Sequence, residues 1–331
     1  MKKVKLSVIF SWALLLGGVM TACSDDERND DPSSRYSPYV TKVFDYCPAP
    51  GQFVNTMPEW KAGDTQETMN KKVLAAIGNN KKGLISLGGF GGYVIVGFDH
   101  TIENISGERD FRILGNAFWA DVNPNPAVTR KGGSCEPGIV MVAYDKNRNG
   151  KPDDDEWYEL AGSEHNKTTT IKDYKITYER PDENKTPVTD VNSPHFSDLE
   201  YIRWTDNQNG NGYLQKNVFS TSHSYYPQWI SGGNITFKGT LLPNNGVNES
   251  LTNEEYWVLY PYDWGYADNV PNDNVESTFD IDWAVDKNGN KVKLQGIDFI
   301  KIYTGVNQSC GWIGEVSTEV CGVEDLHLLN K

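Results

Sequence analysis

Short apolar runs separated by glycine, asparagine and proline recur along most of this 331-residue chain. Many of these runs are rich in β-branched and aromatic residues, a composition typical of strands. The sequence predicts strands at residues 84–87, 93–98, 111–114, 138–144, 157–160, 174–178, 235–237, 256–260 and 296–303. Many short strands broken by turn residues favour an all-β fold, built as an antiparallel β-sandwich or barrel.

One segment has helical periodicity instead. Apolar residues recur at spacings of three and four between Met69 and Ile77. Asp64 or Thr65 can cap such a helix and Gly78 can end it. We therefore expect one short helix, from about Thr65 to Ile77.

Between about residues 181 and 280 the pattern changes to longer polar stretches with dense aromatic residues, as at 206–212. We interpret this region as a large loop-rich insertion. The apolar strand at 296–303 then returns to the pattern of the first half. One folded domain is expected over residues 39–331.

The first 27 residues have the order of a lipoprotein signal. Lysines 2, 3 and 5 precede an apolar run at residues 8–20, and Ala22 stands directly before Cys23. The run is short for a transmembrane helix. The sequence predicts a signal peptide at 1–22, a diacylated Cys23 and a flexible tether at 23–38. The alternative is an uncleaved apolar helix with an incidental cysteine.

Charge and motifs limit the function classes. The chain has 45 acidic and 31 basic residues, a net charge of −14, and loss of the three signal-peptide lysines would lower it to −17. Such a surface repels nucleic acid. The glycine stretch at 87–93 lacks the ending of a phosphate-binding loop, and no zinc pattern or nucleophile elbow occurs. With no catalytic motif, we expect a protein that is not an enzyme.

Four cysteines follow Cys23 in the sequence. Cys310 and Cys321 flank a short segment that could form a hairpin, so the sequence favours a disulfide between them. A disulfide between Cys47 and Cys135 follows only by subtraction.

Residues 145–156 match each fixed position of the twelve-residue calcium loop. Gly150 allows the tight turn, and the flanking segments are strands, so the loop is not an EF-hand. The sequence predicts a possible structural calcium ion bound by Asp145, Asn147, Asn149, the Lys151 carbonyl, Asp153 and Glu156. The alternative is a long hairpin loop whose side chains cap its own backbone.

Aromatic residues beside amide and acid neighbours are the candidate ligand-binding residues. Flat rings next to hydrogen-bonding groups suit a sugar or a macrocycle. The predicted site residues are Trp204, Tyr225, Tyr226, Trp229, Trp264, Tyr266 and Trp312. The alternative for this set is core packing, and Trp257 is the aromatic residue most expected in the core.

Seven segments resemble a family of Bacteroidetes cell-surface lipoproteins, which is similar to the BtuH-type accessory lipoproteins that bind vitamin B12. These segments are residues 96–100, 115–118, 136–142, 156–163, 263–268, 303–308 and 314–320. The acidic residues after Cys23 also resemble the export signal of surface-exposed lipoproteins. The opening and closing segments look like a galactose-binding-like jelly roll.

The resemblance implies a jelly-roll β-sandwich and a function outside the cell. It implies a lipoprotein anchored at Cys23 to the outer membrane and exposed on the cell surface. There it would bind cobalamin or a related corrinoid and pass it to a TonB-dependent transporter. The alternative is a carbohydrate-binding lipoprotein of a glycan-uptake system, and a third possibility is a glycoside hydrolase or an adhesion protein. No catalytic cofactor and no nucleic-acid partner are expected.

Overall fold

The computed structural model describes residues 36–329, which form small antiparallel sheets, two α-helices and three short 3-10 helices. The predicted signal peptide at 1–22, the lipidation site Cys23 and most of the 23–38 tether lie outside the described residues. No helix between residues 36 and 329 is both long and apolar enough to cross a membrane.

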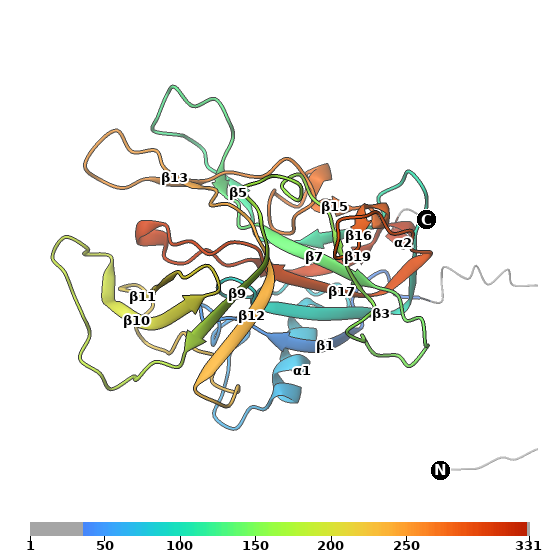
Figure 1. Cartoon of the computed structure of the whole chain (residues 1–331), viewed down its shortest axis with the longest axis horizontal. Coiled ribbons are helices and arrows are strands. Elements are labelled where there is room, and N and C mark those ends of the chain that lie inside the picture. The colour runs from blue at the N-terminus through green and yellow to red at the C-terminus, as the bar shows by residue number, and fades with distance from the viewer. Residues whose placement is uncertain (1–35, 330–331) are drawn as a thin grey trace, which may run out of the picture.

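The largest sheet joins strands from both ends and the middle of the chain (Figure 1). Ile300 and Ile302 of its central strand β17 (Gly296–Thr304) are fully buried, which explains the apolar run there. Pairing on both sides of β17 removes its backbone groups from water. The other strands of this sheet are β1 (Lys42–Cys47), β3 (Tyr93–Glu103), β7 (Gly138–Ala143), β8 (Trp157–Leu160) and β16 (Ala284–Val285).

Four smaller sheets surround this one. One contains β11 (Asn211–Asn217), β10 (Phe196–Asp206), β9 (Ile171–Glu179) and β12 (Asn234–Leu241). A second contains β13 (Gly246–Asn248), β14 (Trp257–Leu259), β6 (Gly133–Ser134) and β5 (Phe118–Trp119). The third contains β15 (Thr278–Phe279), β4 (Phe111–Leu114) and β19 (Gly322–Asp325), and β18 (Glu319–Val320) pairs with β2 (Ile85–Ser86).

The prediction of a single jelly-roll sandwich is wrong, although the mostly β content is correct. The sheets are small and arranged as a four-bladed β-propeller. A sandwich would bury one core between two sheets. The described residues instead form three separate apolar clusters, one around Ile300, one around Tyr178 and one around Leu259.

The expected insertion at 181–280 is divided among three sheets. Strands β10 and β12 pair with β9 and β11 pairs with β10, whereas β13 and β14 join β5 and β6. Strand β15 pairs with β4. Polar composition in this region reflects long strands with one exposed face, such as β12, in which buried and exposed residues alternate.

The predicted helix is present as α1 (Gln66–Ile77). The Thr65 side chain accepts a hydrogen bond from the Thr68 backbone N–H, which caps the first turn. Met69, Val73 and Ile77 are buried in the cluster around Ile300. A second, four-residue helix, α2 (Leu326–Leu329), has no signal in the sequence pattern.

The predicted disulfide between Cys310 and Cys321 is not formed, and all four described cysteines are free. A tight turn at Gly311–Ile313 follows Cys310, which is buried in the cluster around Leu259. Cys321 lies beyond β18, where its thiol faces the Gly115 carbonyl at 3.4 Å. Burial raises the pKa of Cys310 to about 12 and that of Cys321 to about 11. Both therefore remain thiols at neutral pH.

His100 joins the end of β3 to the last strand. Its Nδ1 lies 2.9 Å from Asp99 Oδ1 and its Nε2 lies 2.8 Å from Asp325 Oδ2. Burial opposes protonation, but the hydrogen bonds to Asp325 and Asp99 outweigh it and raise the pKa of His100. The hydrogen bonds of protonated His100 therefore stabilise the folded protein fully below about pH 6.5, the pKa of histidine in the unfolded chain. This stabilisation is lost as pH rises through the higher pKa of His100 in the folded protein.

Replacing His100 by glutamine is expected to destabilise the protein most at pH 5.5–6, by about 1 kcal/mol, because charge-assisted hydrogen bonds are lost. The difference from wild type should shrink towards pH 9. Urea unfolding across this range measures it, with His195→Gln as a control in a histidine that has no described charge partner. A difference that grows with pH would contradict the assignment.

Candidate functional site

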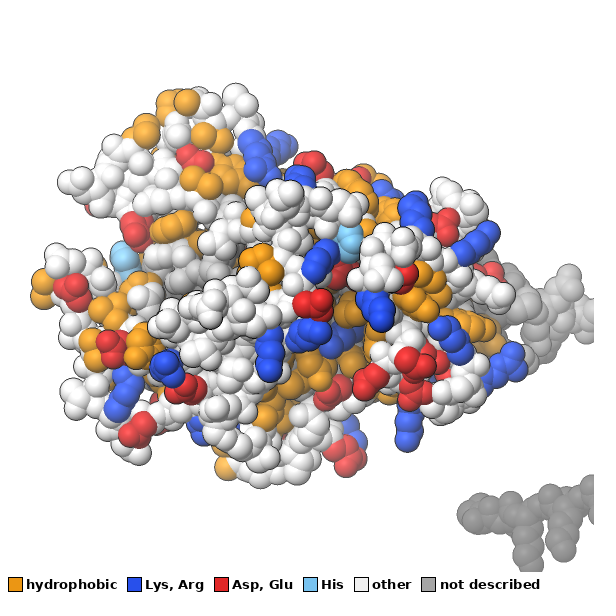
Figure 2. Space-filling view, in the orientation of Figure 1, with side chains coloured by type: hydrophobic (Ala, Val, Ile, Leu, Met, Phe, Trp, Pro, Cys, Tyr) orange, Lys and Arg blue, Asp and Glu red, His pale blue; other side chains and the backbone are white. Residues whose placement is uncertain are grey.

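The described part of the chain contains a cleft of about 880 Å³. It lies between the sheet that contains β5, β6 and β14 and the loop after β11. Figure 2 shows a hollow at the left, between the lobe of β13 and β5 and the lobe of β10 and β11. A cavity of this size lies within the range of small-molecule sites.

Aromatic side chains form the rim of this cleft. Phe219 is 76% exposed, Phe118 58% and Trp312 45%, and Trp257 and Tyr256 complete the rim. Large apolar side chains that converge on one hollow while exposed to water mark binding surfaces. The rim therefore offers flat apolar faces to a ligand.

Trp312 is held at the tip of a hairpin at residues 308–316. The Cys310 N–H donates to the Gly314 carbonyl and the Val316 N–H donates to the Gln308 carbonyl. The base is fixed to Asn245, whose backbone N–H donates to Gln308 Oε1 at 3.1 Å. The Asn217 amide donates to the Trp312 carbonyl at 2.6 Å, which joins the tip to the end of β11. These bonds position the indole without burying it.

Three buried carboxyl groups lie at the floor. Oxygens of Glu136, Asp268 and Glu319 all lie within 4.8 Å of one another, and Glu136 and Glu319 line the cleft. No described lysine, arginine or histidine forms an ion pair with any of them. Burial, together with the charge of Glu319, raises the pKa of Glu136 and Asp268 well above their ordinary values.

This arrangement allows two kinds of chemistry. Three carboxyl oxygens at this spacing could hold a metal ion. Without one, mutual repulsion favours sharing protons, and a protonated carboxyl both donates and accepts hydrogen bonds. The floor could then bind amide or hydroxyl groups of a ligand.

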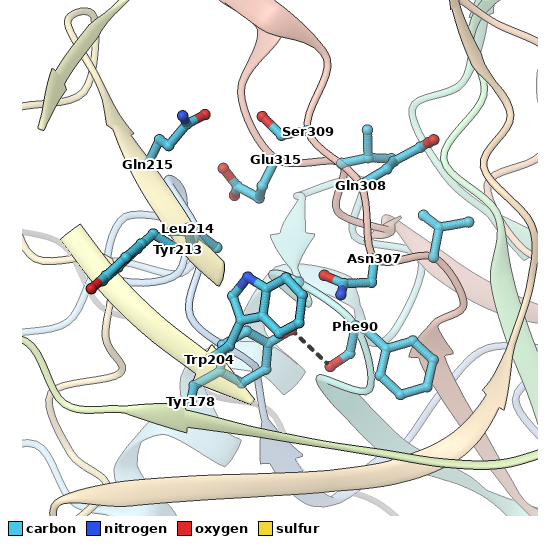
Figure 3. A pocket seen from close by; sticks show the side chains of 13 residues that line it. Phe90, Tyr178, Trp204, Tyr213, Leu214, Gln215, Asn307, Gln308, Ser309 and Glu315 are labelled. Atoms are coloured by element: carbon cyan, nitrogen blue, oxygen red, sulfur yellow. Dashed lines mark hydrogen bonds between the residues drawn. The ribbon is translucent and has the colours of Figure 1, made fainter. Parts of the chain in front are cut away.

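Two of the seven predicted ligand-binding residues line a cavity. Trp312 lies at the rim of the cleft. Trp204, on β10, lines a separate pocket of about 120 Å³ together with Tyr178 and Phe90 (Figure 3).

The other five predicted residues pack within the protein. Tyr225, Tyr226 and Tyr266 are almost fully buried. Trp229 stacks on Tyr46 at 5.6 Å between ring centroids, and Trp264 packs on Trp283 at 4.8 Å. Core packing, the alternative for this set, therefore accounts for them. The hydroxyls of Tyr266 and Tyr225 accept hydrogen bonds inside the protein, from the Glu164 N–H at 2.9 Å and the Asn217 N–H at 3.0 Å. The buried Tyr226 hydroxyl has no hydrogen-bond partner among the described residues.

Sequence reasoning missed most of the cleft. Trp257 was expected in the core and lines the cleft, as do Phe118 and Phe219. Glu136 and Glu319 lie in two of the segments that resemble the lipoprotein family, but no spacing rule connects residues so far apart in sequence. An isolated phenylalanine in a polar segment, as at Phe219, was the available signal.

The loop at 145–156 forms the turn that the calcium pattern requires. The Asp145 carboxylate accepts hydrogen bonds from the N–H groups of Asn149 and Gly150, and Gly150 has φ of +73°. Glu156 accepts from the Lys146 N–H at 2.9 Å. These are the self-capping bonds of the alternative interpretation. Each carboxylate keeps free lone pairs, so the loop retains acceptors for a cation.

Comparison with known proteins finds no family that matches this chain and no curated protein that matches it. The similarity to surface lipoproteins thus remains a prediction, and the candidate site stands on its geometry.

Replacing Asp268 by alanine is expected to cost about 3 kcal/mol or more, because three backbone N–H groups, two of them in buried hydrogen bonds, lose their acceptor. These belong to Asn116, Ala117 and Glu319, at 2.8 to 2.9 Å. Thermal unfolding at pH 7 measures the loss. Glu319→Gln is the matched control, because it removes one repelling charge from the same floor and should leave the melting temperature unchanged or higher. Equal destabilisation by both changes would contradict this account.

Proposed function

We propose that this protein is a lipoprotein on the cell surface that captures a bulky ligand with a flat apolar face in the cleft. Cobalamin or a related corrinoid is the ligand we favour, and a TonB-dependent outer-membrane transporter is the partner that receives it. The lipid anchor at Cys23 would hold the protein at the outer membrane. The observation that carries the proposal is the aromatic rim above three buried carboxyl groups.

The chemistry of a corrinoid matches this rim and floor. A corrin ring is broad and apolar on its faces and carries amides around its edge. The faces of Trp312, Trp257 and Phe118 suit the ring, since aromatic contacts bury large areas. Carboxyl groups of Glu136 and Glu319 suit the amides, because protonated and ionised carboxyls together supply donors and acceptors.

A glycan is the second candidate, and the same cleft supports it. Sugars stack on aromatic rings and direct hydroxyl groups at carboxylates. Trp257 lines the same cleft as the floor residues Glu136 and Glu319, so the cleft offers a sugar both an aromatic ring and carboxyl groups. A glycan array therefore separates the two ligand classes.

Replacing Trp312 by alanine is expected to weaken cyanocobalamin binding at least about tenfold, equivalent to about 1.4 kcal/mol, because a central aromatic contact is removed. Isothermal titration measures the change. Tyr36→Ala is the matched control, since Tyr36 is 42% exposed against 45% for Trp312 and does not line the cleft.

Absence of heat with tens of micromolar wild-type protein would rule out the corrinoid. Binding on the glycan array that depends on Trp312 would then assign the cleft to sugars. Equal losses in Trp312→Ala and Tyr36→Ala would place the ligand outside the cleft.

We also propose that the 145–156 loop binds a structural calcium ion. Calcium should raise the free energy of unfolding by about 2.7 kcal/mol at one hundred times its Kd. Thermal unfolding in calcium and in EDTA measures this effect, and Glu156→Gln should remove it. The control is Asp286→Asn, in a similar turn at 286–290 that has no closing acid. Identical melting in calcium and EDTA would contradict the proposal.

A further inference from the structure

The pocket beside Trp204 differs in chemistry from the cleft. Its volume is about 120 Å³, against about 880 Å³ for the cleft, so it admits a small head group and not a macrocycle. Residues from β9, β10 and β11 form one side, and the segment 306–309 forms the other. Figure 3 shows the Glu315 carboxyl between Ser309, Gln215 and Trp204.

Glu315 is the unusual residue of this pocket. It is only 7% exposed, and its Oε1 accepts a hydrogen bond from the Gln52 N–H at 2.5 Å. Its Oε2 is buried and has no hydrogen-bond partner among the described residues. A buried carboxyl oxygen without a donor carries a desolvation cost. A ligand that brings a donor would remove that cost.

The surroundings indicate which donor fits. No lysine, arginine or histidine of the described chain lines the pocket, so no side chain there neutralises Glu315. The aromatic faces of Trp204, Tyr178 and Phe90 attract a cation through their electron-rich rings. A chain with a net charge of −14 also draws cations towards its surface.

Some of the other polar side chains in the pocket already make hydrogen bonds within the protein, and others are available to bind a ligand. Gln308 Oε1 already accepts from Asn245 and its amide donates back to Asn245 Oδ1, and the Asn307 amide donates to Tyr174 Oη. The side chains of Ser309 and Gln215 make no hydrogen bond within the described part of the chain. Their oxygens remain available to accept from further N–H groups.

We propose that this pocket is a second binding site, separate from the cleft, for the head group of a small primary amine in its ammonium form. One N–H donates to Glu315 Oε2, and the others can donate to Ser309 and Gln215. The charge lies against the Trp204 ring. A primary ammonium suits the site better than a quaternary one, because only the primary form has N–H donors.

The site should depend on pH. Burial raises the pKa of Glu315 to about 8, and the charge of Glu319 adds to the effect. The other ionisable groups close to it are Tyr178 and Tyr225, and Tyr213 lines the pocket with its hydroxyl directed away from Glu315. Below pH 8 the carboxyl must release a proton before it binds a cation, so affinity should rise roughly tenfold per pH unit between pH 6 and 7.

The test is a titration of the full chain with ethylammonium, followed by ligand-observed NMR, with ethanol and acetate as probes of the same size. Ethylammonium should bind with higher affinity at pH 8 than at pH 6, and the neutral and anionic probes should bind at least tenfold more weakly. Glu315→Gln should weaken ethylammonium binding at least tenfold, whereas Glu200→Gln, an exposed charge on β10, should not.

Ethanol binding as tight as that of ethylammonium would overturn the proposal, as would unchanged affinity in Glu315→Gln. If Glu315→Gln does not fold, Trp204→Leu is the variant that tests the proposed site. That change keeps an apolar wall and removes the ring, so affinity for ethylammonium should fall at least threefold, and unchanged affinity would overturn the assignment. Cyanocobalamin binding in the cleft is measured separately, so the failure of one site does not imply the failure of the other.

Discussion

The cleft depends on the hydrogen bonds that the Asp268 carboxylate accepts from backbone N–H groups. Its Oδ1 accepts from the N–H groups of Asn116 and Ala117, and its Oδ2 accepts from that of Glu319. The Glu136 N–H donates to the Asp268 carbonyl. One residue thus joins the segments before β5, before β7 and at β18. Gly115 is required beside it, because a Cβ there would lie 2.2 Å from Asp268 Oδ1. The same bonds bring three carboxyl groups together, so the cluster at the floor results from the way the sheets are joined.

The hairpin at 308–316 lies between the cleft and the small pocket and contributes residues to both. Trp312 and Ile313 line the cleft, while Ser309 and Glu315 line the small pocket. Gln52 contacts both sides, since its backbone N–H donates to Glu315 Oε1 and its side chain donates to the Ile313 carbonyl. A ligand that moves Trp312 would therefore act on a segment that also forms the wall of the second pocket. The proposals for the two sites differ accordingly, with a flat apolar ligand in the cleft and a small cation in the pocket.

The sequence predicted the elements that depend on local pattern. The apolar β-branched runs of β7 and β17 and the capped periodicity of α1 are local signals, and all three elements are present. The pairing order is not local. Strand β17 lies between β3 and β7 although these two precede it by more than 150 residues, and many strands have only two residues. No alternation can be read from two residues, so the local pattern could not show how these strands pair. The jelly-roll expectation rested on the resemblance of the opening and closing segments, and the pairing order contradicts it.

The site was predictable only in part, again for a physical reason. Trp312 was predicted as one of the aromatic residues in segments with amide and acid neighbours, and it does line the cleft. Tyr225 and Tyr266 lie in similar segments of the sequence, yet their hydroxyls make hydrogen bonds inside the core.

Hydrogen–deuterium exchange of the full chain, with and without cyanocobalamin, tests most directly the claim that the cleft binds the ligand. The account predicts slower exchange at 116–120, 217–220 and 311–314, three separate segments that meet only at the cleft. Protection elsewhere, or none, would contradict it.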